Sequence, residues 1–240
     1  MKWSQITDVG RVRAGNEDSL CACPDIGLFA VADGMGGHKA GEIASSTALQ
    51  YLEENLREIL PGTGTKDISA DLLRILEKAN LRVYRLSNEF DQYRGMGTTV
   101  TAGIVTGYDL VIAHIGDSRA YLIRGSEISQ LTEDHSLVGE MLRHGGITEE
   151  QAINHPQRNV LTRAMGTAPA VKFELYIQTL SPGDKVLFCT DGLFNHLRPE
   201  EIKEIITSQP HLDRCLKILL DTALERGGTD NITMVLVEME

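Results

Sequence analysis

The chain has 240 residues, of which 42% are hydrophobic, and a formal net charge of −11. This length fits one large domain or two small ones, and the acidic balance argues against a nucleic-acid partner, because phosphate backbones require a surplus of Lys and Arg. No apolar run approaches the roughly 18 residues of a membrane span, and residues 1–10 lack the basic-then-apolar pattern of a secretory signal. With four cysteines that fit a reducing compartment, we expect a cytoplasmic protein.

The first half of the chain predicts strands interrupted by a pair of helices. LFAVAD (28–33) is typical of a short buried strand. Helical patterns follow over 38–60 and 68–90, separated by the breaker-rich linker PGTGTKD (61–67). GTTVTAGIVTG and DLVIAHIGDS then predict two adjacent strands, and RAYLIRGSEISQL predicts a hairpin that turns at Gly125-Ser126.

The second half begins with a change of character over 135–165, where short helical pieces and glycine pairs predict an exposed subdomain. VKFELYIQTL and DKVLFCTDG return to strands, with SPG (181–183) as the turn between them. Helices are expected over 199–208 and 212–226, and NITMVLVEM closes the chain as a strand. Strands joined by short turns, with long helices inserted in pairs, favour an α+β fold with antiparallel sheets.

The stretch VADGMGGHKAGE (31–42) raises two interpretations, a nucleotide-binding loop and a metal site. A dinucleotide loop would have Gly or Ala where Lys39 stands, and Asp33 would place a negative charge beside the phosphates. The acidic residues about 20 positions later lie within a helical pattern instead of after a strand. We therefore discard the nucleotide interpretation.

Carboxylates recur at the ends of apolar strands, and this pattern favours a metal site. Besides Asp33, they are Asp117 in VIAHIGDSR, Asp191 in VLFCTDGL, Asp230 in GGTDNITMVLV, and Glu17 and Asp18 in NEDS. If these ends converge, desolvating the charges without a counterion would cost several kcal/mol. An all-oxygen ligand set points to Mg²⁺ or Mn²⁺ rather than zinc. In this interpretation Asp33 bridges two ions, Gly34 lets the chain turn with its carbonyl on one of them, and Gly36 and Gly37 keep side chains clear.

The cysteines give a weaker signal. Cys21 and Cys23 face the same side of an expected strand, whereas Cys189 and Cys215 lie in apolar periodic segments. A C-x-C motif without a second Cys or His pair is a poor zinc signature, so the sequence favours packing as the role of these thiols.

With these motifs in their order and spacing, the chain resembles the metal-dependent serine/threonine protein phosphatases of type 2C, in their compact bacterial form. The resemblance spans nearly the whole chain and is carried by TDVGRVRAGNEDS, VADGMGGHKAGE, GMGTTV, AHIGDSRAY, LTEDHS, HPQRNVLTRAMG, LFCTDGL and GGTDNITMV. It implies a four-layer α-β-β-α sandwich, with two antiparallel sheets flanked by helix pairs. It also implies a single phosphatase domain over 1–240 with a flap subdomain over about 143–165.

The resemblance also implies roles for individual residues. It makes Asp33 the bridging ligand of two ions, with Gly34 on one and Asp191 and Asp230 on the other. The remaining implied residues are Asp18 as a direct or water-mediated ligand, Glu17 as a less secure one, Asp117 at a third, weaker metal site, Arg13 on the substrate phosphate and His38 as general acid.

The implied reaction is hydrolysis of phosphoserine and phosphothreonine in proteins by a water activated between two divalent metals, Mn²⁺ or Mg²⁺. The expected partners are phosphorylated proteins and an opposing bacterial serine/threonine kinase, and nothing in the chain demands more than a monomer. Two alternatives compete with this function. A catalytically silent regulatory module of the same fold would be free to lose its metal ligands, and a metal-dependent nuclease would need a basic surface.

Other polar residues are expected to be structural. His114, inside an apolar strand, is predicted to be a satisfied core histidine. His135 is expected at a helix start, with Asp134 or Ser136 as the cap. Thr98 and Thr99 are expected to pack behind the site. Within the flap, Arg143, His155 and Arg158 are assigned to substrate preference.

Overall fold

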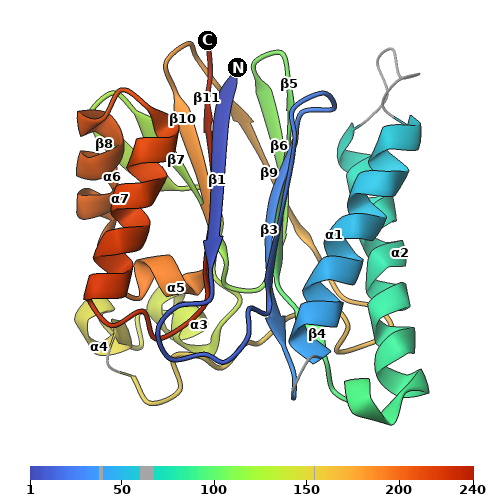
Figure 1. The fold of residues 1–240 in the computed structure, drawn as a ribbon. Coiled ribbons are helices and arrows are strands. Elements are labelled where there is room, and N and C mark those ends of the chain that lie inside the picture. Colours follow the sequence, from blue (N-terminus) through green and yellow to red (C-terminus); the bar gives the residue numbers. More distant parts are fainter. Residues whose placement is uncertain (38–39, 60–67, 154) are drawn as a thin grey trace.

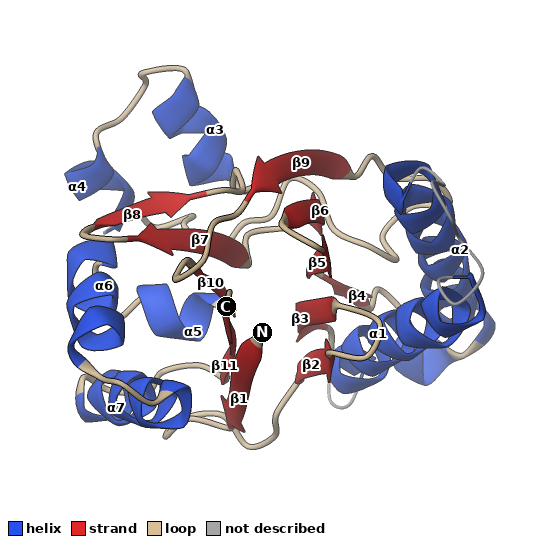
Figure 2. Ribbon diagram, turned by 90° about the horizontal axis from the view of Figure 1, so that it is seen from above, coloured by secondary structure: helices blue, strands red, loops and turns tan. Residues whose placement is uncertain are grey.

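A computed structural model describes residues 1–37, 40–59, 68–153 and 155–240. Two antiparallel sheets lie face to face, and a pair of long helices covers the outer face of each (Figure 1). Viewed from above, the order of layers is helices, sheet, sheet, helices (Figure 2). This arrangement confirms the four-layer sandwich.

Each sheet is built from segments distant in the sequence. Sheet A has the order β1 (Lys2–Asp8), β11 (Ile232–Glu238), β10 (Lys185–Cys189), β7 (Arg119–Arg124) and β8 (Glu127–Gln130). Sheet B has the order β2 (Asp18–Cys23), β3 (Leu28–Met35), β5 (Val100–Thr106), β6 (Asp109–Ile115) and β9 (Glu174–Thr179), and β4 (Gly97–Thr98) pairs with the end of β3.

Helices α1 (Ala40–Ile59) and α2 (Ile68–Glu89) cover sheet B, and α6 (Pro199–Ser208) and α7 (Leu212–Glu225) cover sheet A. A short 3₁₀ helix (Asp91–Tyr93) follows α2. The helices α3 (Leu137–Arg143) and α4 (Glu149–Ile153) project beyond the sandwich, and α5 (Asp191–Phe194) follows β10 directly (Figure 2). Among the described residues, no helix has both the length and the apolar character needed to cross a bilayer.

The core consists of three apolar layers, one at each interface of the sandwich. On β3, Phe29 and Val31 point between the sheets, whereas Leu28, Ala30 and Ala32 face the α1–α2 pair. β11 divides its residues between the two sides in the same way. Because successive side chains of a strand point to opposite faces, a strand buried on both faces is apolar throughout, as LFAVAD is.

Most of the predicted elements are confirmed within one or two residues, with three differences. The expected strand of residues 28–33 continues to Met35, and neither β1 nor the single turn α5 was predicted. The SPG turn is confirmed between β9 and β10. It carries the chain from sheet B to sheet A, because β9 pairs with β6 whereas β10 pairs with β7 and β11. The linker at 61–67 lies outside the described residues.

The predicted structural roles of the two buried histidines are confirmed. The ring nitrogens of His114 lie 2.9 Å from Thr101 Oγ1 and 3.0 Å from the Glu133 carbonyl oxygen. His135 precedes the N-cap of α3, where Ser136 Oγ accepts a hydrogen bond from the Gly139 amide at 3.1 Å. Both histidines hold the segment around residues 133–136 against sheet B.

The contact between the sheets at Gly103 yields a stability prediction. A Cβ at this position would lie 2.5 Å from Phe188 Cζ and 3.0 Å from Leu110 Cδ1, in the layer between the sheets. Overpacking a filled core costs about 1–3 kcal/mol, so we expect Gly103→Ala to lower the free energy of unfolding by that amount in urea denaturation. Gly146→Ala, whose Cβ would meet its nearest neighbour at 3.4 Å, is the matched control and should change little. Equal stability of the two variants would contradict tight packing at Gly103.

Candidate active site

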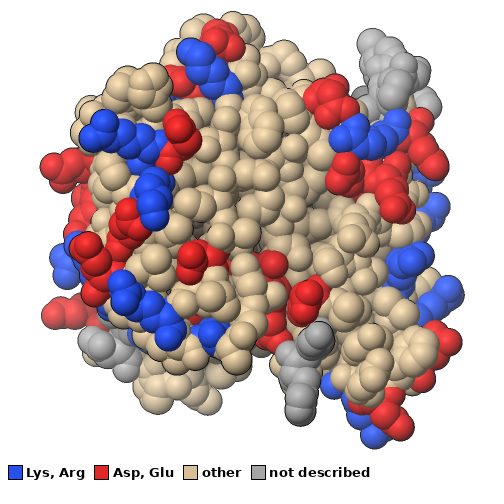
Figure 3. Space-filling model, viewed as in Figure 1, with Lys and Arg blue, Asp and Glu red and all other residues tan. Residues whose placement is uncertain are grey.

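The strand-end carboxylates converge at the end of the sandwich away from the chain termini. Asp18 begins β2 and stands opposite Asp33 in the register of β2 and β3. Asp117 follows β6, Asp191 begins α5 after β10, and Asp230 lies two residues before β11. Acidic side chains gather there between the two halves of the molecule (Figure 3, lower centre). The structure therefore unites carboxylates that lie more than 200 residues apart in the chain.

A cavity of about 530 Å³ opens at this end of the sandwich. Seven of the predicted site residues line it, namely Arg13, Glu17, Asp33, Gly34, Asp117, Asp191 and Asp230. Asp18 is buried beside Asp33 and contributes its charge from behind. His38 lies outside the described residues. Both sheets contribute to the cavity, so its shape depends on how they pack together.

Threonine hydroxyls fix the backbone of Asp33 on both sides. The Asp33 amide donates to Thr99 Oγ1 at 2.9 Å, and its carbonyl oxygen accepts from Thr98 Oγ1 at 2.9 Å and from the Thr99 amide at 2.9 Å. Thr99 Oγ1 also lies 2.7 Å from Ser118 Oγ, next to Asp117. The expectation that the two threonines pack behind the site is confirmed, and their hydroxyls also hold Asp33 in place.

The structure corrects the reason given for Gly34. The strand does not turn at this residue, because β3 continues through it to Met35. A Cβ on Gly34 would lie 2.1 Å from the Gly41 carbonyl oxygen and 2.5 Å from the Glu17 carbonyl oxygen. Gly34 is required because the start of α1 approaches the strand this closely. Gly36 has a positive φ of +153°, a backbone conformation that other residues rarely adopt. A Cβ on Gly37 would meet no neighbouring atom.

Two carboxylate oxygens are buried without a hydrogen-bond partner in the described part of the chain, Asp18 Oδ1 and Asp191 Oδ1. The other oxygens of the same groups are bonded: Asp18 Oδ2 accepts from Thr190 Oγ1 at 2.8 Å, and Asp191 Oδ2 accepts from Asn195 Nδ2 at 3.0 Å. Leaving a buried charged oxygen unpaired is costly. Each carboxylate is thus held by one oxygen and keeps the other unpaired, Asp191 in the lining of the cavity and Asp18 behind it.

The pKa values of the site carboxylates also indicate that a cation is needed here. Burial first, and then the charges of Asp191 and Asp230, raise the pKa of Asp18 to about 7. Burial and Asp230 raise the pKa of Asp191 to about 6, and burial together with the surrounding carboxylates raises the pKa of Asp33 well above its ordinary value. The pKa of Asp117 is also raised, again chiefly by burial. A hard divalent cation removes this conflict, and the all-oxygen donor set fits Mg²⁺ or Mn²⁺.

Arg13 lies at the mouth of the cavity on the loop between β1 and β2. Its Nη2 donates to Asp230 Oδ2 at 2.8 Å, and about half of its side chain is exposed. The hydrogen bond to Asp230 raises the pKa of Arg13, so the guanidinium stays charged. It is therefore a fixed cation beside the carboxylates, with donors still available for an anionic ligand.

Asn231 is a positioning residue that the sequence reasoning missed. Its Nδ2 donates to the carbonyl oxygens of Val9 at 2.9 Å and Gly15 at 3.0 Å, and its Oδ1 accepts from the Glu17 amide at 2.8 Å. One side chain thus ties the loop that carries Arg13 to the start of β11. The sequence analysis considered Asp230 in this stretch because it is charged, and it gave no role to the neutral Asn231 beside it.

Arg163 was also missed. It lines the cavity together with Asn159 and Thr162, and its Nη2 pairs with Glu174 Oε1 at 2.9 Å. Of the flap residues assigned to substrate preference, Arg143 pairs with Glu133 Oε2 at 2.7 Å and does not line the cavity. The part of the 135–165 segment that reaches the site is therefore its C-terminal end.

Comparisons with known proteins agree with this geometry. A family model described as protein phosphatase 2C matches residues 13–230. The serine/threonine phosphatase stp of Listeria monocytogenes serotype 4b (strain F2365) is 38% identical over 237 residues, which cover 98% of this chain and 94% of that protein.

Solved structures show the same likeness. The Mycobacterium tuberculosis serine/threonine phosphatase PstP/Ppp superimposes with a TM-score of 0.92 at 36% identity, covering 100% of this chain and 98% of that one. A structure of the catalytic domain of the serine threonine protein phosphatase PstP in complex with two manganese ions gives a TM-score of 0.89 at 34% identity, covering 100% and 98%.

The crowded carboxylates predict an unusual gain of stability on mutation. Asp191→Asn removes one charge but keeps an acceptor for Asn195. In the folded wild-type protein the pKa of the Asp191 carboxyl is about 6, above the ordinary value of 3.8. The wild-type protein therefore loses stability as pH rises from about 4 through about 6. We expect the variant, freed from this loss, to be more stable than wild type by on the order of 2 kcal/mol at about pH 8, and equal to it at about pH 4.

The measurement is urea denaturation of both proteins in EDTA at the two pH values. Asp221→Asn, on the exposed face of α7, is the control and should show no gain that depends on pH. Saturating Mn²⁺ should reverse the order, because a bound cation stabilises the carboxylate form. A destabilised Asp191→Asn protein at the higher pH would show that repulsion among the carboxylates does not control stability at this site.

Proposed function

The chain belongs to the protein phosphatase 2C family, and from that premise we propose how its residues carry out the reaction. The protein is a metal-dependent serine/threonine phosphatase that removes phosphate from phosphorylated proteins. The observation that best supports the residue roles is the pair of unpartnered buried oxygens on Asp191, which lines the cavity, and on Asp18, which lies behind it, where carboxylates of both sheets meet.

Two divalent cations, Mn²⁺ or Mg²⁺, would be held at this end of the sandwich by the side chains of Asp33, Asp191 and Asp230 and the carbonyl oxygen of Gly34. Asp18, Glu17 and Asp117 would add their carboxylates at the same end. When bound, the cations lower the pKa of water towards neutrality and offset the charge of the phosphate group.

The chain's own residues position the substrate. The Arg13 guanidinium can hold two phosphate oxygens in a forked geometry while its remaining donor stays near Asp230. Hydrolysis cleaves the bond between phosphorus and the serine or threonine oxygen, and the released oxygen must take up a proton. His38 is the predicted donor of that proton, and its role stays a prediction because the residue lies outside the described part of the chain.

The cellular setting is inferred from the substrate class. Phosphorylated proteins are the substrates, and a serine/threonine kinase of the same cell is the opposing enzyme. A cytoplasmic location is supported by the four cysteines, all of which are free thiols. The monomer is the expected active unit. The silent regulatory module gains no support, since none of its expected ligand losses has occurred.

The first test of the proposed metal ligands is hydrolysis of para-nitrophenyl phosphate and of a phosphothreonine peptide, with Mn²⁺ and with EDTA. Residues that only support a metal ligand change activity by about 10- to 100-fold, so removal of a ligand in Asp191→Ala should cost at least about 100-fold on both substrates. Asp221→Ala is the matched control. Metal-dependent release of phosphate by wild type and loss only in Asp191→Ala would support the assignment. A folded, metal-loaded wild type without activity would return the silent module to first place.

Arg13 allows a sharper test, because it touches Asp230 as well as the space for substrate. Charge-assisted hydrogen bonds contribute about 1.5–3 kcal/mol each, so Arg13→Ala should lower kcat/KM by about 10- to 100-fold at saturating Mn²⁺. Arg13→Lys should recover only part of this loss, because an ammonium cannot fork. Arg11→Ala, on the same loop but outside the cavity, is the control.

Inhibition by inorganic phosphate separates the two roles of Arg13. If Arg13 binds the phosphate group of the substrate, the inhibition constant of inorganic phosphate should rise in Arg13→Ala in proportion to the loss of kcat/KM. An unchanged inhibition constant together with a raised Mn²⁺ requirement would instead make Arg13 a positioning residue for Asp230.

A further inference from the structure

Two thiols and a carboxylate meet at the C-terminal end of β2, the end away from Asp18. Cys21 and Cys23 point to the same face of β2, with their Sγ atoms 3.5 Å apart. Glu53 reaches this face from α1, with its Oε2 3.7 Å from Cys21 Sγ. One ligand atom from each of the three residues lies within 4.8 Å of the others. Three metal-binding side chains thus converge at a place that the phosphatase reaction does not use.

The spacing matches a small tetrahedral ion. Bonds of about 2.3 Å to sulfur and about 2.0–2.2 Å to oxygen separate two sulfur ligands by about 3.8 Å, and a sulfur from an oxygen by about 3.5–3.7 Å. The observed separations of 3.5 Å and 3.7 Å agree with these values to within a few tenths of an ångström. Only small side-chain movements are therefore needed to admit an ion.

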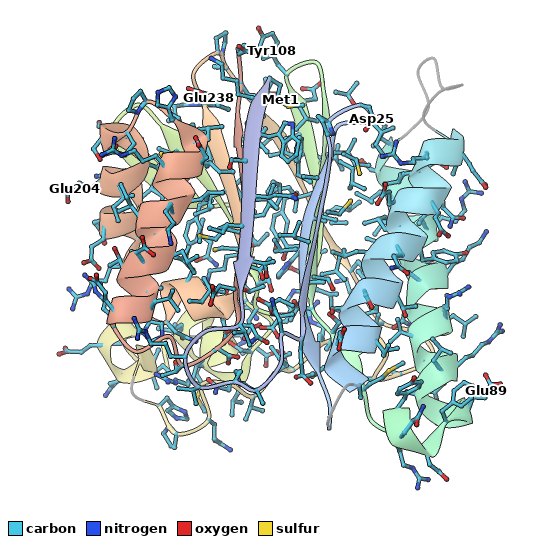
Figure 4. The ribbon with its side chains drawn as sticks, in the orientation of Figure 1. Met1, Asp25, Glu89, Tyr108, Glu204 and Glu238 are labelled. Atoms are coloured by element: carbon cyan, nitrogen blue, oxygen red, sulfur yellow. The ribbon has the colours of Figure 1, made fainter. Side chains whose placement is uncertain are left out.

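Glu53 is held in place by a neighbouring ion pair. Arg57, one turn further along α1, donates from Nε to Glu53 Oε1 at 2.9 Å, which leaves Oε2 towards the thiols. Arg57 also pairs with Asp25 in the turn after β2, labelled in Figure 4. Two carboxylates thus balance the guanidinium, and its hydrogen bond lowers the pKa of Glu53. An oriented, ionised carboxylate is typical of a supported metal ligand.

Burial determines the protonation of the thiols. Cys21 and Cys23 are 6% and 7% exposed, and burial raises the pKa of both, so without a cation they are neutral. The Glu53 side chain is 35% exposed, which opens the cluster to solvent on that side. A cation can therefore enter past Glu53, and a water can complete its coordination there.

We propose that Cys21, Cys23 and Glu53 bind one thiophilic divalent cation, of the class of Zn²⁺, separately from the carboxylate site. On binding, two S–H bonds are lost, two protons pass to solvent and two thiolates bind the ion, without a change of oxidation state. The ion joins β2 to α1, so the folded state is favoured when it is bound. Thiolates select it against Mg²⁺ and Mn²⁺, which the carboxylate end prefers.

The test titrates Cd²⁺ into the intact protein with a phosphine reductant and saturating Mg²⁺, and follows sulfur-to-cadmium charge-transfer absorption. Carboxylates give no such band, so the signal reports the thiol site whether or not the protein is active. One equivalent per chain should produce the band in wild type. Cys21→Ser and Cys23→Ser should abolish it, and Cys215→Ser, a buried cysteine of the other half, should leave it unchanged.

Glu53→Gln keeps both thiols and lies partly exposed, so it tests the third ligand without disturbing the core. We expect it to keep the band but to raise the dissociation constant at least tenfold. Zn²⁺ should also raise the melting temperature of wild type more than that of Cys21→Ser at saturating Mg²⁺. Absence of the thiolate band in wild type, or its persistence in folded Cys21→Ser, would overturn the proposal.

Discussion

Mutual repulsion among buried carboxylates is the constraint on which the rest of this structure depends. Five aspartates would separate if the fold allowed it, so rigid elements must hold each of them. Backbone pairing fixes Asp18 opposite Asp33, threonine hydroxyls fix Asp33 on both sides, and Thr190 and Asn195 each bind one oxygen of a carboxylate. One oxygen of Asp18 and one oxygen of Asp191 are left without a hydrogen-bond partner among the described residues. Stability is given up locally so that charge is available for catalysis, a compromise common at functional sites.

The packing of the two sheets sets the spacing of these groups. Asp18, Asp33 and Asp117 belong to sheet B, whereas Asp191 and Asp230 belong to sheet A. Their separation therefore depends on the apolar layer between the sheets, where large side chains of one sheet fill gaps left by the other, as Phe188 does over Gly103. Interiors packed at crystal-like density resist compression. A layer that looks purely structural thus determines the geometry of the site several residues away.

The sequence predicted which carboxylates converge better than it predicted their surroundings. Charged residues at the ends of apolar runs, such as Asp33 after LFAVA, mark both an element and a site, so local patterns sufficed for them. Four layers could not be read from periodicity, because β3 and β11 are buried on both faces and show no alternation. Gly34 was predicted in the right place but for the wrong reason, since its need for space arises from Gly41 on a neighbouring element. Contacts between distant segments decide such cases, and a single sequence does not display them.

The same limitation explains why the thiol pair looked inert. A zinc motif is recognised in sequence by a second Cys or His pair near the first. Here the third ligand candidate is Glu53 on α1, 30 residues after Cys23. β2 then carries oxygen ligands at one end and sulfur ligands at the other. Asp18 and Cys21 are three residues apart, about 10 Å along a strand, and share no hydrogen-bond partner among those found in the described residues. Sites so separated in a rigid sheet add their free energies nearly independently. Ligand chemistry alone can therefore sort two kinds of cation along one strand.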